Sequence, residues 1–232
     1  MKLKSIKSSL YFDYQATTPV APEVLAKMLP YFAESFANPH ASDHVLGWDS
    51  AAAIDFAQKQ LADFVGADSD EIIFTSGATE SNNLALLGLA KRARQLGSVR
   101  NRILLSAIEH KCILAIGRVL QSEFGFEVEY VPVDNNGQVI AAELDKRMAA
   151  DVLLVSIMTV NNEIGVIQDI AGLSGIVRKY GALFHTDGAQ APLALALPSI
   201  IDYVDALSIS AHKMYGPKGV GVLYLRRDLH DQ

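Results

Sequence analysis

The sequence contains very little cysteine, with Cys112 the single thiol among 232 residues. One thiol excludes a disulfide within the chain and any metal site built from several cysteines. A run of eighteen apolar residues is also missing, so no membrane-spanning segment is predicted. The basic N-terminal heptapeptide has no apolar stretch behind it, unlike a secretory signal. These features predict a protein of a reducing compartment, the cytoplasm, with no membrane partner.

Positive charge is scarce as well. Twenty lysines and arginines face 26 aspartates and glutamates, which gives a formal net charge of −6. Without a basic cluster, nucleic acid is not expected as the main partner. A glycine-rich P-loop and a dinucleotide-binding fingerprint are both missing, which disfavours a simple nucleotide-binding protein. No repeat, low-complexity tract or linker divides the chain, although its length alone would suit one large domain or two small ones.

From residue 71 onward, short apolar runs alternate with segments of helical periodicity. The predicted strands are residues 72–75, 102–106, 126–131, 152–158, 182–186, 204–209 and 220–225. Strands that alternate with helices, several of them apolar on both faces, predict an α/β fold with a mostly parallel sheet covered on both sides. We expect residues 1–15 to form an extended arm and residues 16–232 to form one large domain. Within that domain, further helices are predicted over residues 22–32 and 44–64.

Several polar residues come directly after predicted strands: Thr79, His110, Asn162, Asp187 and Lys213. Ligands of open α/β sheets bind beyond the carboxyl ends of the strands. We therefore expect these five side chains to lie around one site.

Three features of this set suggest a particular chemistry. The turn Ser76–Glu80 opens a helix whose free backbone N–H groups suit a phosphate, with the hydroxyl of Thr79 as a further donor. Lys213 lies in a tight loop between two apolar strands, where partial loss of water lowers the pKa of an amine and prepares it to attack a carbonyl. Asp187 needs a partner if it is buried, and a protonated pyridine nitrogen would be one. Taken singly, each could instead be a helix cap, a solvated lysine or a turn aspartate.

The remaining candidates fit the same chemistry. Asn162 and Gln190 are amides that could bond a phenolic oxygen, and His110 could lie against an aromatic ring. Ser210 and His212 flank the lysine closely enough to contact a phosphate. Each has an ordinary structural reading as well, such as a loop-stabilising amide. Together, a phosphate cradle, a carboxylate for a ring nitrogen and a lysine for an aldehyde are what pyridoxal phosphate requires.

The motifs that contain these residues resemble one enzyme family along the chain from about residue 11 onward. They are Tyr-Phe-Asp-Tyr-Gln-Ala-Thr-Thr-Pro (11–19), Thr-Ser-Gly-Ala-Thr-Glu-Ser-Asn-Asn (75–83), Glu-His-Lys (109–111), Val-Asn-Asn-Glu-Ile-Gly-Val (160–166), His-Thr-Asp-Gly-Ala-Gln (185–190) and Ser-Ala-His-Lys-Met-Tyr-Gly-Pro-Lys-Gly (210–219). The chain resembles the large domain of fold-type I pyridoxal phosphate enzymes, within the class-V aminotransferase-like group. Its motifs are most similar to the cysteine desulfurases that supply sulfur for iron–sulfur cluster assembly.

The resemblance implies a role for each candidate. Lys213 would bond the cofactor and move the substrate α-proton, and His110 would stack on the ring. Ring and phosphate contacts would come from the remaining residues, namely Asp187 at the ring nitrogen, Asn162 and Gln190 at the phenolic oxygen, and Ala78 (through its backbone), Thr79, Ser210 and His212 at the phosphate. The implied reaction converts L-cysteine to L-alanine and leaves a persulfide on an enzyme cysteine. A homodimer and an iron–sulfur scaffold or another sulfur-acceptor protein are the implied partners, and no metal is expected.

Family members are longer than this chain. The smaller C-terminal domain, the arginine that binds the substrate carboxylate and the loop with the nucleophilic cysteine are expected beyond the strand that follows the lysine loop. Cys112 lies elsewhere and is expected to be an inert thiol. We therefore predict cofactor binding by this chain, with full turnover dependent on the missing segment. Alternative interpretations are another fold-type I aminotransferase or lyase, and a catalytically silent scaffold.

Overall fold

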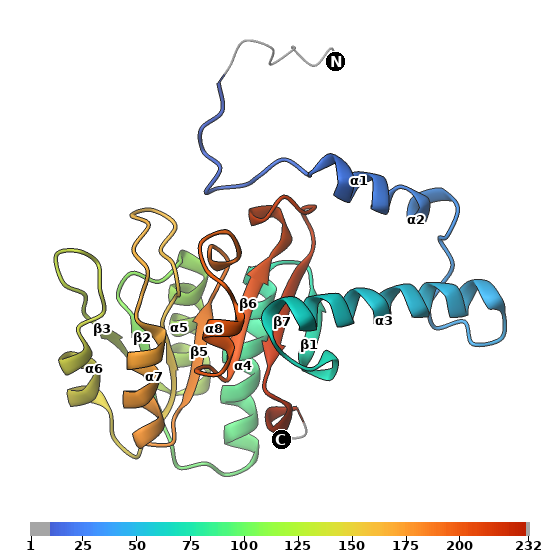
Figure 1. The fold of residues 1–232 in the computed structure, drawn as a ribbon. Helices are drawn as coiled ribbons and strands as arrows, with labels where there is room; N and C mark the ends of the chain where they lie inside the picture. Colours follow the sequence, from blue (N-terminus) through green and yellow to red (C-terminus); the bar gives the residue numbers. More distant parts are fainter. Residues whose placement is uncertain (1–9, 231–232) are drawn as a thin grey trace.

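A computed structural model describes residues 10–230, which fold around one seven-stranded sheet (Figure 1). The strand order is β1-β7-β6-β5-β4-β2-β3. Strand β7 runs antiparallel to both of its neighbours, and the other neighbouring pairs are parallel. The predicted α/β fold with a mostly parallel sheet is confirmed.

The elements follow the predicted alternation. The strands are β1 (Ile72–Thr75), β2 (Arg102–Ser106), β3 (Glu127–Val131), β4 (Val152–Ser156), β5 (Leu183–Asp187), β6 (Ala206–Ser210) and β7 (Gly221–Leu225). The α-helices are α1 (Pro22–Met28), α2 (Pro30–Ala33), α3 (Val45–Val65), α4 (Ala78–Gln95), α5 (Lys111–Phe124), α6 (Ala141–Arg147), α7 (Ile170–Lys179) and α8 (Pro198–Ile201). Short 3-10 helices cover Ser69–Glu71, Ala191–Leu193, Ala211–Lys213 and Arg227–Leu229. No helix within residues 10–230 is long and apolar enough to cross a membrane.

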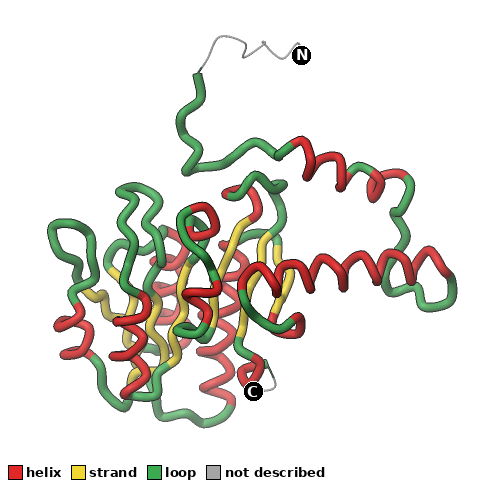
Figure 2. The backbone as a smooth tube through the Cα atoms, viewed as in Figure 1, coloured by secondary structure: helices red, strands yellow, loops and turns green. Residues whose placement is uncertain are grey.

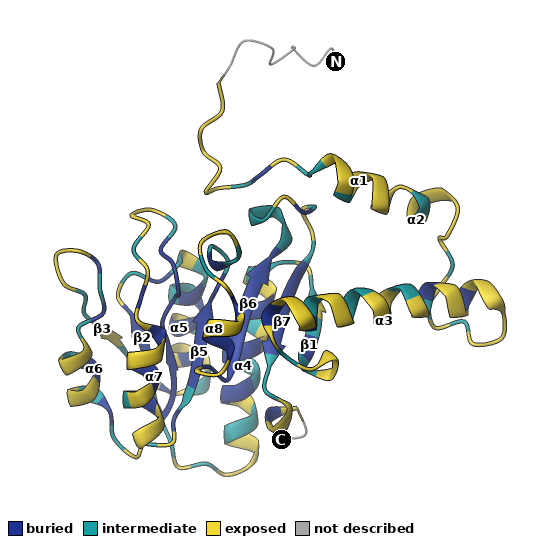
Figure 3. Ribbon diagram, viewed as in Figure 1, coloured by how far each residue is buried: buried dark blue, intermediate teal, exposed yellow. Residues whose placement is uncertain are grey.

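Helices lie on both faces of the sheet (Figure 2), and its central strands are buried (Figure 3). Helices α4 and α5 cover one face, where Ile103 and Leu105 of β2 point. The other face packs against α6, α7, α8 and the end of α3, and it receives Leu104 of the same strand. All three leucine and isoleucine side chains are fully buried. Two apolar layers therefore hold the strands in place and fix where their carboxyl ends lie.

One element of the N-terminal part differs from the prediction. The helix expected over residues 22–32 is divided into α1 and α2 at Pro30, which has no N–H to continue the helical ladder. Of the predicted arm, residues 1–9 lie outside the described part of the chain, and residues 10–15 are exposed and irregular. Helix α3 occupies its predicted place, yet Ile54 and Phe64 remain 43% and 41% exposed.

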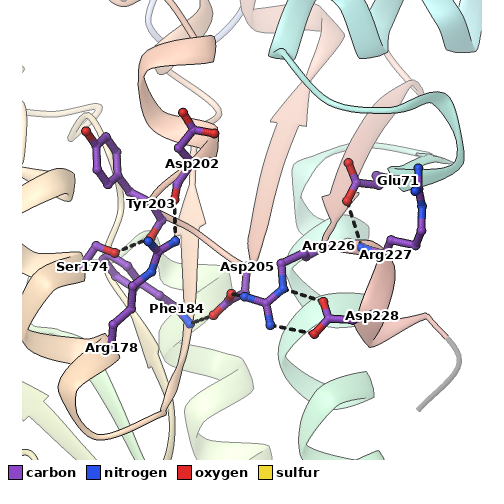
Figure 4. Close-up of polar contacts among 10 residues, drawn as sticks. All are labelled: Glu71, Ser174, Arg178, Phe184, Asp202, Tyr203, Asp205, Arg226, Arg227 and Asp228. Carbon is purple, nitrogen blue, oxygen red and sulfur yellow. Dashed lines mark hydrogen bonds and ion pairs between the residues drawn. The ribbon is translucent and has the colours of Figure 1, made fainter.

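The amino ends of β5 and β6 are joined by a polar network (Figure 4). Asp205 accepts a hydrogen bond from the backbone N–H of Phe184 at 2.7 Å and forms an ion pair with Arg226. In the same region Ser174 of α7 donates to the carbonyl of Tyr203 at 2.7 Å. These contacts fix the β6–β7 hairpin at the end opposite to its connecting loop.

A buried histidine lies in the centre of the sheet. His185 of β5 contacts Ser156 of β4 through Nδ1 at 2.9 Å and Ser208 of β6 through Nε2 at 3.1 Å. Burial lowers the pKa of His185 to about 3 because a charged imidazolium would have no water around it. The ring therefore bridges three neighbouring strands in its neutral form.

We predict that His185 makes the fold sensitive to acid. Between the unfolded pKa of about 6.5 and the folded value, only the unfolded chain binds this proton, so stability falls as pH falls. The slope from this one group approaches about 1.4 kcal/mol per pH unit. Urea unfolding from pH 7 to pH 5 should show a smaller slope for His185→Gln than for the unsubstituted protein. Equal slopes in the two proteins would contradict the prediction.

Candidate functional site

A cavity of about 570 Å³ opens at the carboxyl ends of the parallel strands. The loops after β1, β2, β4, β5 and β6 all contribute to its wall. It is lined by all nine residues that the sequence singled out: Ala78, Thr79, His110, Asn162, Asp187, Gln190, Ser210, His212 and Lys213. Residues more than 130 positions apart in the chain are thus brought together by the strand order alone.

The turn before α4 gives the cavity a set of free backbone donors. Gly77 is the N-cap of α4, and no side chain bonds the first N–H groups of this helix. The φ of Gly77 is 152°, a conformation that L side chains rarely adopt. Gly221 of β7 lies against this turn. A Cβ added at Gly221 would lie only 2.4 Å from the Cα of Gly77, so the position accepts glycine alone. This backbone approach leaves the N-terminus of α4 open, and its N–H groups and dipole suit a phosphate.

Asp187 ends β5 with its carboxylate buried. Oδ2 accepts from the amide of Asn82 at 2.8 Å, and Oδ1 accepts from the backbone N–H of Ala189 at 2.9 Å. Burial raises the pKa of Asp187, while these hydrogen bonds act in the opposite direction. Among residues 10–230, no cationic side chain forms an ion pair with it. A buried carboxylate that lines a cavity and has no ion-pair partner there fits a protonated ring nitrogen.

Asn82 is a site residue that the sequence reasoning did not single out. It is fully buried on α4, and its amide nitrogen also lies 3.3 Å from the sulfur of Cys112. Its Oδ1 has no hydrogen-bond partner among the described residues. The available signal was its position three residues after Thr79, which places both on one face of the helix.

His110 is oriented by the start of α5. Its Nδ1 accepts from the backbone N–H of Cys112 at 3.3 Å, and the thiol of Cys112 lies 2.9 Å from the same nitrogen. Because Nδ1 is an acceptor, a neutral His110 ring has its proton on Nε2. Burial raises the pKa of the Cys112 thiol, so the thiol remains protonated and donates to the ring. Cys112 lines the cavity, which the sequence did not predict.

A second buried carboxyl group lies beside the site. Glu109 accepts the backbone N–H of Met158 through Oε1 at 2.6 Å, and this bond ties the loop after β2 to the loop after β4. Burial, and then the nearby charge of Asp187, raises the pKa of Glu109 well above its usual value. Its Oε2 has no partner in the described part of the chain. Glu109 therefore favours the neutral form, and Asp187 is left as the carboxylate of the site.

Lys213 lies in the short 3-10 helix after β6, half-buried. Burial lowers the pKa of its amine, and the charge of Asp187 works against that shift. The amine donates to the backbone carbonyl of Gln15, and Gln190 donates to the same carbonyl at 2.8 Å. The pKa of the neighbouring His212 is also lowered, mainly by burial. Asn162 faces the cavity while its amide bonds Glu163 at 2.7 Å.

The acidic, cysteine and histidine side chains of the site do not form a metal centre. Within residues 10–230 there is no group of three or more such residues that could hold an ion. The arrangement instead brings the uncapped N-terminus of α4, the carboxylate of Asp187 and the amine of Lys213 to one cavity.

Comparison with known proteins places this geometry in a family. Residues 10–232 match the family model "Aminotransferase class-V". Among curated relatives, the human cysteine desulfurase is 49% identical over 94% of this chain, and the cysteine desulfurase IscS of Rickettsia typhi is 44% identical over 97% of it. These alignments cover 47% and 54% of the two relatives, so the chain spans about half their length. Relatives from Drosophila melanogaster and Trachipleistophora hominis are named as mitochondrial and mitosomal.

Solved structures give the same result. SspA in complex with cysteine superposes with a TM-score of 0.88 at 40% identity, over 94% of this chain and 62% of SspA. A NifS-like protein superposes with a TM-score of 0.87 at 39% identity, over 95% of this chain and 60% of that protein. Proteins of this group use pyridoxal phosphate, in agreement with the chemistry inferred from the cavity. The chain belongs to the class-V aminotransferase family.

Proposed function

We propose that this chain is the cofactor-binding part of a pyridoxal phosphate-dependent cysteine desulfurase. The observation that carries the proposal is the meeting of the open α4 N-terminus, the buried Asp187 and the amine of Lys213 in one cavity. Residues 16–232 would act as the cofactor-binding domain and residues 1–15 as its arm.

The cavity offers a complementary group for each part of the cofactor. The N–H of Ala78 and the side chains of Thr79, Ser210 and His212 would bind the phosphate. Asp187, held by Asn82, would keep the proton on the ring nitrogen, and Asn162 and Gln190 would contact the phenolic oxygen. His110 would stack on the ring, with its orientation set by Cys112. Bound pyridoxal phosphate supplies an electron sink for negative charge at the substrate α-carbon.

Two side chains are suited to proton transfer. Lys213 has a lowered pKa, so a larger fraction of its amine is unprotonated near neutral pH than for a solvated lysine. Lys213 would therefore hold the cofactor through its aldehyde and would serve as the base for the substrate α-proton. His110 presents Nε2 as the nitrogen that is not bonded to Cys112, available for proton exchange with a substrate group.

The proposed substrate is L-cysteine, with L-alanine as the product and the sulfur passed as a persulfide to a cysteine of the enzyme. Sequence identity to curated desulfurases and the structural likeness to SspA in complex with cysteine support this choice. Cys112 does not suit the nucleophile, since its thiol donates to His110 and its pKa is raised. The partners in this proposal are a second copy of the chain and an iron–sulfur scaffold or another sulfur acceptor, in the reducing cytoplasm.

We predict that Lys213→Ala abolishes covalent cofactor binding. The unsubstituted protein should develop a yellow absorbance band with pyridoxal phosphate, and borohydride should fix the cofactor to Lys213, as seen by peptide mass spectrometry. Lys218→Ala is the matched control, because Lys218 lines the same cavity in the same loop. It should keep the band and bind several-fold more weakly. A band of equal intensity in Lys213→Ala would contradict the assignment.

Product analysis then tests the substrate. With L-cysteine and a thiol reductant, the complete enzyme should release alanine and sulfide in equal amounts. Transfer of the amino group to a keto acid would instead indicate an aminotransferase, and absence of cofactor binding would indicate a silent scaffold. Cofactor binding with neither product from the complete enzyme would contradict the desulfurase proposal.

We predict that Cys112 reacts slowly with alkylating reagents. Its thiol is partly buried with a raised pKa, so the thiolate that reacts is scarce near neutral pH. Iodoacetamide at pH 7.5 should modify the folded protein at least tenfold more slowly than the urea-unfolded chain, as followed by intact mass. Cys112→Ala should still bind pyridoxal phosphate. Rapid alkylation of the folded protein, or loss of binding in Cys112→Ala, would contradict this picture.

A further inference from the structure

The chain segment before α1 is hydrogen-bonded to the loop that carries Lys213. Thr18 and Ala21 donate their backbone N–H groups to the carbonyls of His212 and Tyr215, at 2.8 and 2.9 Å. Thr17 contacts Nδ1 of His212 at 3.1 Å through its hydroxyl. Figure 1 shows this segment passing over the carboxyl ends of the strands on its way to α1. The lysine loop thus has a second support besides its own hairpin.

Thr18 makes the central contacts of this support. Its hydroxyl donates to the carbonyl of His212 at 3.0 Å and accepts the backbone N–H of Tyr215 at 2.8 Å. The residue is only 3% exposed, so water cannot easily replace these bonds. One hydroxyl group therefore holds the backbone on both sides of Lys213, from the residue before it to the second residue after it.

The loop needs this support because its backbone is unusual at Tyr215. Tyr215 has a φ of 62°, and it is the one non-glycine residue with a positive φ in the described part of the chain. Left-handed backbone is disfavoured for an L-residue with a bulky side chain and persists where the surroundings impose it. The adjoining turn is tight as well, since the N–H of Gly216 bonds the carbonyl of Ala211 at 2.8 Å. Such strain commonly accompanies functional sites.

We propose that Thr18 is a positioning residue, whose hydroxyl holds the strained 212–215 loop so that the amine of Lys213 points into the cavity. This inference rests on the proposed function for the role of the amine, but the contact itself does not depend on a cofactor. A hydroxyl is required because the same atom must donate to one backbone group and accept from another.

The substitutions that test this are a matched pair. Thr18→Ala and Thr18→Ser both remove the methyl group, and they differ by the hydroxyl. Thr18→Val keeps the shape and removes the hydroxyl. Ser174→Ala is the distant control, because it removes a buried hydroxyl bond to Tyr203 at the opposite end of the strands.

Two measurements on the cofactor-free protein report the mobility of the 211–216 backbone and the titration midpoint of the Lys213 amine. In hydrogen–deuterium exchange, Thr18→Ala and Thr18→Val should speed exchange of the 211–216 amides at least tenfold, with strands β2 and β4 unchanged. In competitive acetylation of lysines across pH, the midpoint for Lys213 should move upward in both variants, because a loosened loop lets water reach the amine. Thr18→Ser and Ser174→Ala should match the unsubstituted protein in both measurements.

The outcomes separate the two proposals. Unchanged exchange and an unchanged Lys213 midpoint in Thr18→Ala would overturn the role of Thr18, as would equal effects of Thr18→Ala and Thr18→Ser. Adding pyridoxal phosphate to the unsubstituted protein tests the proposed function separately. If the cofactor does not bind, the proposed function fails, and the exchange and acetylation results still test the role of Thr18. If Thr18→Val does not fold, the alanine and serine pair still decides.

Discussion

The site depends on one backbone contact, the approach of Gly77 to Gly221. Strand β7 lies between β1 and β6, so its first residue passes directly beside the turn that opens α4. Gly221 has no room for a Cβ, and Gly77 adopts a φ of 152° that L side chains rarely take, so the two backbones can touch. This contact places the uncapped start of α4 next to the hairpin loop with Lys213. A phosphate and an aldehyde of one small molecule can then be reached from two distant parts of the chain.

Burial and hydrogen bonding decide which of two neighbouring carboxyl groups, Glu109 or Asp187, carries the negative charge. Glu109 and Asp187 each raise the cost of charging the other, and Glu109, with a single hydrogen-bond donor in the described part of the chain, is the poorer carboxylate. Asp187 accepts two hydrogen bonds and remains the better place for negative charge. Of these two carboxyl groups, Asp187 is the one that lines the cavity and can meet a cation there. His185, two residues before Asp187 on the same strand, is buried and neutral. It therefore adds no positive charge that would compete with a cation for Asp187.

Much of the fold and nine of the residues that line the cavity could be predicted from sequence, for a simple physical reason. Polar residues that follow strands must gather where parallel strands end, so Thr79, Asp187 and Lys213 could be placed on one cavity without coordinates. Asn82, Glu109 and Thr18 were missed because their roles depend on which backbone group or side chain they meet across the fold. Similarly, the apolar spacing of α3 predicted a helix correctly but could not say that Ile54 and Phe64 would stay exposed.

The bond between Thr18 and His212 also has a consequence for how the protein is made. It joins residues separated by 194 positions in the chain. At a synthesis rate of 5–20 residues per second, Thr18 is synthesised roughly ten to forty seconds before its partner exists. During that interval the hydroxyl of Thr18 has no backbone partner in the lysine loop, and the closure of so long a loop comes late. The cavity that this segment helps to line is therefore among the last parts of the nascent chain to take shape.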